Sequence, residues 1–134
     1  MNDYKLVISE YYDLLNLHKA LLEAKFNSNP DNEYIAGSPI VAKISNEIIE
    51  LLRIYDLKKK GKEDWSEWRK ISNQELYMNR AIDKIVRFGE WENLDYEEKK
   101  EKIYNYLSPF CCSEDEIRYI MHEIDKKLFD SPKE

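Results

Sequence analysis

Apolar side chains recur every three or four residues along most of the chain, which is the spacing of one face of an α-helix. This pattern predicts a short helix over residues 65–71 and longer helices over residues 3–26, 39–58, 73–88, 95–107 and 113–129. No stretch alternates apolar and polar residues as a half-buried strand would. The pattern therefore predicts an all-α fold, a single-domain bundle of five or six helices, mostly antiparallel. The domain covers residues 1–134, with a frayed tail over residues 129–134.

Local signals mark the ends of these helices. Ser38 precedes Pro39, a serine cap followed by proline at the first helical position, and Gly61 can end the same helix. The spacing of a capping box, a capping side chain followed three residues later by a glutamate, occurs over residues 64–67, 72–75, 95–98 and 113–116. Residues 27–38, rich in Asn, Asp, Pro and Gly, form the one clear loop.

The second helix is strongly apolar. Its predicted inward face consists of Ile40, Val41, Ile44, Ile48, Leu51, Leu52 and Tyr55. The first helix also carries a wide apolar stripe, which is typical of a helix with more than one packed neighbour. If one copy of the fold does not cover these faces, a homodimer would, so we keep a homodimer as an open expectation.

Composition narrows the class of protein. The chain has 134 residues, of which 43% are hydrophobic, enough to build a core and too many for a disordered chain. No run approaches the roughly 20 apolar residues of a membrane-spanning helix, and the first ten residues lack the pattern of a signal peptide. Cys111 and Cys112 are adjacent and have no other cysteine to pair with. We therefore expect a cytoplasmic protein without membrane contact.

The net charge is −6 and is spread evenly along the chain. Residues 1–67 hold 9 basic and 12 acidic side chains, and residues 68–134 hold 12 and 15, so each half carries −3. A net-negative surface repels phosphate at long range, which counts against general nucleic-acid binding. A basic protein partner would suit it.

Residues 58–70 are a local exception, with six basic and three acidic side chains around Trp65 and Trp68. Basic residues interleaved with aromatics are typical of surfaces that bind single-stranded nucleic acid, although the acidic residues weaken that reading. Two other interpretations stay open. The tryptophans can cover the core, or they can anchor a protein partner.

Residues 90–101 have the opposite charge, with six acidic and two basic side chains. Acidic residues steer association with basic surfaces, and aromatic residues supply buried contact area. The candidate partner-binding residues in this stretch are Trp91, Glu92, Tyr96, Glu97 and Glu98. The alternative is a solvated charged face beside core aromatics.

Catalytic chemistry has little support in the sequence. His18 and His122 lack the ligand spacings of known metal motifs, so a zinc site would require the first and last helices to be neighbours. Cys112 precedes a helix start, where a thiol pKa can fall, but a nucleophile also needs a base. We expect no catalytic residue, no metal and no cofactor.

These observations favour a protein that binds another protein, for example a stoichiometric inhibitor such as an immunity protein or an antitoxin. A regulatory or adaptor module fits the same features. Two alternatives remain: a nucleic-acid-binding accessory protein that uses residues 58–70, and a small metal or thiol enzyme built on the histidines and Cys112.

Overall fold

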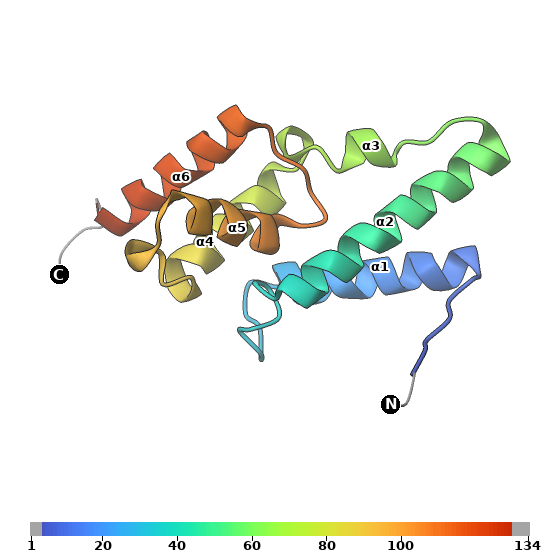
Figure 1. The fold of residues 1–134 in the computed structure, drawn as a ribbon, viewed down its shortest axis with the longest axis horizontal. Coiled ribbons are helices and arrows are strands. Elements are labelled where there is room, and N and C mark those ends of the chain that lie inside the picture. Colours follow the sequence, from blue (N-terminus) through green and yellow to red (C-terminus); the bar gives the residue numbers. More distant parts are fainter. Residues whose placement is uncertain (1–3, 130–134) are drawn as a thin grey trace.

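A computed structural model describes residues 4–129 of the chain, and in this part it contains six α-helices and no strand (Figure 1). The α-helices are α1 (Tyr11–Phe26), α2 (Pro39–Lys60), α3 (Trp65–Trp68), α4 (Glu75–Phe88), α5 (Tyr96–Leu107) and α6 (Glu114–Phe129). Two 3₁₀ turns, η1 (Ile71–Asn73) and η2 (Trp91–Asn93), precede α4 and α5. The all-α prediction is confirmed. None of the described helices is long and apolar enough to cross a membrane.

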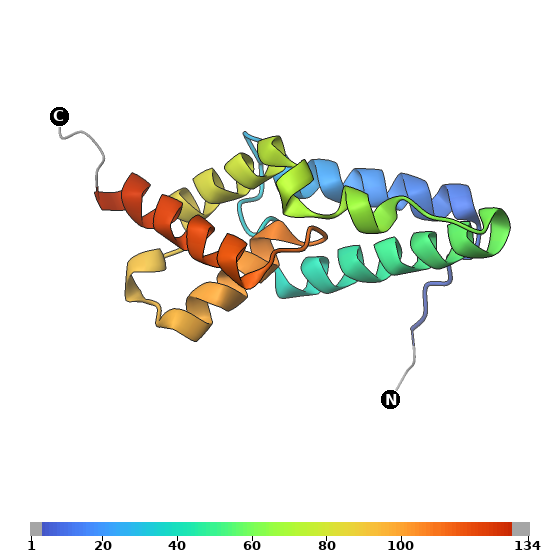
Figure 2. The same ribbon diagram turned by 90° about the horizontal axis from the view of Figure 1, so that it is seen from above.

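The helices form two packed groups, which lie at opposite ends of the molecule in Figures 1 and 2. At one end, α1 and α2 run antiparallel around a small core of Leu14, Ile48, Ile49 and Leu52. At the other end, α4, α5 and α6 enclose a larger core that also takes in Phe26 from the end of α1. Trp68 of α3 packs against both cores. The short α3 therefore joins the two groups.

Most of the helix ends follow the local signals. The Ser38 side chain accepts a hydrogen bond from the backbone N–H of Val41, and Gly61 ends α2 with a left-handed φ of 75°. The reciprocal capping boxes of residues 95–98 and 113–116 both form. These features use contacts within three or four residues, so the local sequence is sufficient to specify them.

The first helix begins at Tyr11, and the prediction that it begins at residue 3 is wrong over residues 4–10. Residue 3 lies outside the described residues. The side chains of Tyr4, Leu6 and Val7 are 80–88% exposed. Tyr11 already packs against Tyr55 near the end of α2, with ring centroids 4.6 Å apart. Because α2 ends five residues later, an earlier turn of α1 would have no helix to pack against, and propensity alone rarely holds such a turn.

The predicted helix over residues 65–71 ends at Trp68, and α4 begins at Glu75. The expected capping boxes over residues 64–67 and 72–75 are wrong, because neither Asp64 nor Gln74, the observed cap of α4, makes a side-chain cap. Lys70 instead forms an isolated parallel bridge with Cys111. The backbone N–H of Ile71 donates to the Cys111 carbonyl at 3.0 Å. This long-range pairing extends the chain where a helix was expected.

At the C-terminus, α6 runs to Phe129. The frayed tail predicted over residues 129–134 lies outside the described residues from residue 130 on. Residue 129 itself is the last residue of α6.

Candidate functional site

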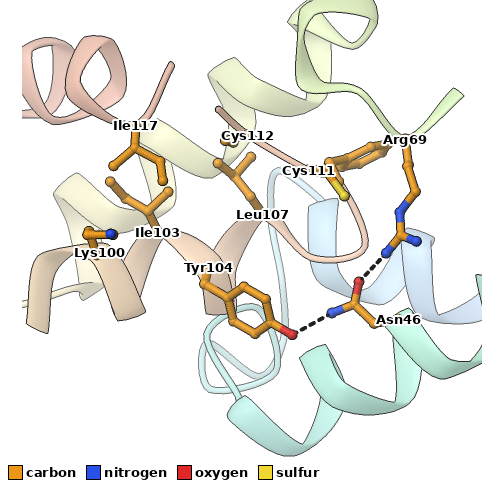
Figure 3. Close-up of a pocket in the computed structure, with 10 residues that line it drawn as sticks. Asn46, Arg69, Lys100, Ile103, Tyr104, Leu107, Cys111, Cys112 and Ile117 are labelled. Atoms are coloured by element: carbon orange, nitrogen blue, oxygen red, sulfur yellow. Dashed lines mark hydrogen bonds between the residues drawn. The ribbon is translucent and has the colours of Figure 1, made fainter. Parts of the chain in front are cut away.

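A pocket of about 380 Å³ opens between α2, α5 and the loop that leads into α6 (Figure 3). The side chains of α5 that line it lie at positions 100, 103, 104 and 107, which share one face of a helix. After α5, the Ser108–Pro109 pair ends the helix and brings Phe110, Cys111 and Cys112 along the pocket wall. The apolar residues of the lining are Ile103, Leu107, Phe110 and Ile117.

Asn46 of α2 organises the polar rim of this pocket. Its amide nitrogen lies 3.0 Å from the hydroxyl oxygens of both Tyr104 and Ser108. Its amide oxygen accepts a hydrogen bond of 2.7 Å from Arg69, as Figure 3 shows. The remaining Arg69 nitrogens donate to Glu50 at 2.9 Å and to the carbonyl of Pro109 at 3.0 Å. Every nitrogen of this guanidinium group is therefore in use.

Lys100, the second cation of the pocket, pairs with Glu114 at 2.8 Å. This hydrogen bond and the charge of Glu114 raise the pKa of Lys100. Both cations in the pocket are thus paired with carboxylates, and the centre of the lining is apolar. Such a pocket suits an uncharged apolar group better than an anion.

Cys112, the thiol that precedes α6, is held in its protonated form. Cys112 is half-buried, and burial, followed by the charge of Glu116, raises the pKa of its thiol to about 12. A thiol with this pKa remains protonated near neutral pH and is a poor nucleophile. Cys111 is exposed and, like Cys112, is a free cysteine.

The two histidines lie in different environments. His18 of α1 is buried against Trp65 and Trp68, whereas His122 of α6 is exposed. Cys112 packs against the larger core instead. In the part of the chain that the structure describes, no group of three His, Cys, Asp or Glu side chains is placed to hold a metal ion.

Only some side chains of the acidic stretch, residues 90–101, are exposed. Trp91 is 2% exposed, and its indole N–H donates to Asp125 at 2.8 Å. Trp91 is therefore a core residue, which corrects its place among the candidate partner-binding residues. Glu98 caps α5, and Tyr96 donates its hydroxyl to Glu114 at 3.2 Å.

The other acidic candidates of this stretch, Glu92 and Glu97, are exposed. In the described structure neither of them forms an ion pair. They are free to contact a partner.

The basic side chains of residues 58–70 fall into two groups in the fold, exposed lysines and cations in ion pairs. Lys58, Lys59, Lys60 and Lys62 are exposed at the end of α2, but Lys70 pairs with Glu67 and Arg69 pairs with Glu50. Trp65 and Trp68 are half-buried and contact His18. Nucleic-acid binding by this stretch stays a prediction.

An exposed apolar stripe runs along α2, on part of the face that was predicted to point inward. Four residues assigned to its inward face are 37–70% exposed: Ile40, Ile44, Leu51 and Tyr55. Ile54, which was not assigned to that face, is 39% exposed. Ile48 and Leu52 of the predicted face are buried, together with Ala42, Ser45, Ile49 and Asp56, which were not assigned to it. The helical period alone separates the two sides of α2. The exposed stripe has positions 40, 44, 51 and 54, and the opposite, buried stripe has positions 42, 45, 49, 52 and 56.

The stripe is continuous with the pocket. Asn46 lines the pocket and also a shallow groove that reaches Leu51.

Comparisons with protein-family models, with curated proteins and with solved structures found no match for the chain. Function is therefore argued from this geometry alone.

Proposed function

We propose that the protein acts by binding another protein, which inserts an apolar side chain into the pocket beside Asn46 and lies along the exposed stripe of α2. The observation that carries this proposal is the pocket itself. Its floor is apolar, and the polar side chains Asn46, Arg69 and Ser108 at its rim are held by internal hydrogen bonds. Hot spots of protein interfaces cluster in pockets from which a bound side chain excludes water.

The stripe on α2 supports the same reading. Exposed apolar residues scattered singly on a surface need no explanation, but a row of them along one helix face indicates an interaction site. Ile44, Leu51 and Ile54 form such a row, and the groove beside Asn46 leads from the row to the pocket. Together they offer a long contact surface with one deep anchor point.

Charge indicates the chemistry of the partner. Glu47 on α2 and Glu97 and Glu101 on α5 are exposed and form no ion pair within the described residues. On α5, positions 97, 101 and 104 share the face that carries Tyr104 at the pocket rim. We therefore expect a partner whose apolar anchor is flanked by basic residues, since opposite charges at the rim speed association and favour the correct partner. A stoichiometric inhibitor, such as an immunity protein or an antitoxin, would use a surface of this kind.

Two exposed residues allow the proposal to be tested without damage to the core. Leu51→Asp places a charge on the stripe, and Tyr104→Ala removes the aromatic rim of the pocket. Tyr119→Ala is the matched control, because Tyr119 is a similarly exposed tyrosine on α6 outside the pocket lining. The purified proteins are first used to retain a partner from the native cell extract, and the retained protein is then produced alone for calorimetry.

We expect the wild type and Tyr119→Ala to bind the purified partner with equal affinity. We expect Leu51→Asp and Tyr104→Ala each to weaken binding about tenfold or more, the loss typical of a hot-spot residue. If all four proteins bind the partner equally, or if no protein is retained in stoichiometric amount, the proposal is wrong.

A further inference from the structure

A second pocket, of about 430 Å³, lies between α1 and α3 and shares no residue with the first. Its lining consists of Leu15, His18, Lys19, Leu22, Asp56, Asp64, Trp65, Trp68 and Tyr77. Four helices contribute to it, and four of its nine lining residues carry aromatic rings. The proposed function does not use this pocket.

Two tryptophans form adjoining walls. The ring centroids of Trp65 and Trp68 are 5.6 Å apart, and the ring planes meet at 78°. His18 packs edge-to-face against both, with centroid distances of 5.4 Å and 5.1 Å, which fixes the orientation of the indoles. Both tryptophans remain half-buried rather than buried, and Tyr77 of α4 adds a further aromatic side. The faces of such rings carry partial negative charge.

Two carboxylates stand beside these rings. Asp56 is 7% exposed, and its Oδ2 accepts a hydrogen bond of 3.0 Å from the indole N–H of Trp65. Its Oδ1 is buried and has no hydrogen-bond partner among the described residues. Asp64 is exposed and makes neither a helix cap nor an ion pair there. A buried carboxylate oxygen without a partner is costly, which leaves a place for a donor with positive charge.

The pocket supplies little positive charge of its own. Lys19 is the only lysine or arginine in the lining, and it is exposed. Burial, followed by the charge of Lys19, lowers the pKa of His18 to about 4. The imidazole is therefore neutral near pH 7, so the two carboxylates outweigh the single lysine.

We propose that this pocket binds an organic cation, an alkylammonium or guanidinium group, held between the faces of Trp65 and Trp68 and paired with Asp56 and Asp64. Perpendicular aromatic faces beside carboxylates provide both contributions that such a cation needs, attraction to the ring faces and charge neutralisation. A small metabolite and the side chain of a lysine or arginine in a protein both present this group.

The test compares two probes of nearly equal shape that differ in charge. Choline carries a quaternary ammonium group, and 3,3-dimethylbutan-1-ol is its uncharged carbon analogue. Each is titrated into ¹⁵N-labelled protein, and the indole N–H signals are followed by NMR. The chain has three tryptophans, and Trp91, which is buried in the other core, serves as an internal control.

We expect choline to shift the signals of Trp65 and Trp68 but not that of Trp91. We expect the alcohol to bind about tenfold more weakly, as the loss of one well-placed cation–π contact and one ion pair implies. Asp64→Asn should weaken choline binding several-fold and leave binding of the alcohol unchanged. Glu92→Gln, which removes the same charge from an exposed site outside the pocket, should change neither.

Two further arms distinguish the sources of the cation. Nα-acetyl-lysine methylamide and Nα-acetyl-arginine methylamide represent protein side chains. Tighter binding of these two than of choline assigns the site to a polypeptide, and the reverse order assigns it to a small metabolite. Equal binding of choline and the alcohol, or a choline affinity unaffected by Asp64→Asn, would overturn the proposal. So would a choline titration that leaves the signals of Trp65 and Trp68 in place.

Discussion

Lys25 offers a sharp test of the described packing. It lies in the last turn of α1 with 1% of its surface exposed, and its Nζ donates to the backbone carbonyl of Asn105 at 2.7 Å. Burial lowers its pKa from the ordinary 10.5 to about 7. In the described structure no carboxylate pairs with it. We predict that Lys25→Met stabilises the protein at and below neutral pH.

The magnitude follows from the two pKa values. Because the pKa in the folded protein lies below that in the unfolded chain, the unfolded chain binds this proton more tightly between pH 7 and pH 10.5. At or below pH 7 the cost is present in full, roughly 5 kcal/mol at about 1.4 kcal/mol for each pH unit. It falls as the pH rises and vanishes near 10.5. Methionine removes this cost and loses a hydrogen bond to Asn105, which is worth about 1–3 kcal/mol once the unpaired carbonyl is included.

We therefore expect Lys25→Met to raise the free energy of unfolding at pH 6 by about 2–4 kcal/mol. Urea unfolding measured at intervals from pH 6 to pH 8.5 provides the test. The wild type should gain stability above pH 7, by up to about 1.4 kcal/mol per pH unit for Lys25. The variant should show a smaller gain, which comes from Lys84, because burial lowers the pKa of this lysine as well. The range stops at pH 8.5 because burial raises the pKa of the Cys112 thiol from 9.0 to about 12, which would oppose the slope at higher pH.

Lys19→Met is the matched control, since Lys19 is an exposed lysine on the same helix. It should retain the slope of the wild type. A wild-type stability that stays constant or falls between pH 7 and pH 8.5 would refute the reasoning. An equal slope in wild type and Lys25→Met would refute it as well, because the slope would then arise elsewhere.

Two further changes test local features. His18→Phe should resist acid. The pKa of His18 is lowered from 6.5 to about 4, so the wild type loses about 3 kcal/mol as the pH falls through this range and the variant does not. Acid unfolding followed by circular dichroism measures the difference, and identical curves would contradict the assignment. Gly61→Ala should lower the free energy of urea unfolding by about 1 kcal/mol, because the φ of 75° strains an L-residue although no atom lies near the added methyl. A neutral effect would show that the left-handed end of α2 is not required.

The parts of the fold that the sequence predicts well depend on near neighbours. Ser38, Gly61 and the capping boxes at residues 95–98 and 113–116 each act over at most four residues. The parts that failed depend on distant ones. Lys70 is extended where it pairs with Cys111, about 40 positions away. A capping pattern at residues 64–67 carries no sign of that pairing.

The candidate site illustrates the same limit. Asn46 joins Arg69, Tyr104 and Ser108 through contacts that span 23, 58 and 62 positions. An asparagine inside a predicted helix gives no indication of such a role, because it is equally compatible with a solvated position. The pocket therefore had to be found from the fold.

The two apolar sides of α2 show what the apolar periodicity of a sequence can and cannot predict. A helix with a single neighbour needs one apolar stripe, and α2 has two. The stripe with Ile49 and Leu52 packs against α1, and Ile44 and Leu51 of the other stripe are 41% and 49% exposed. Amphipathic periodicity detects both but cannot say which one the fold covers. An apolar side that the fold leaves exposed points to a contact outside the chain, and for that reason we place the function there rather than at Trp91, whose ring the fold already buries.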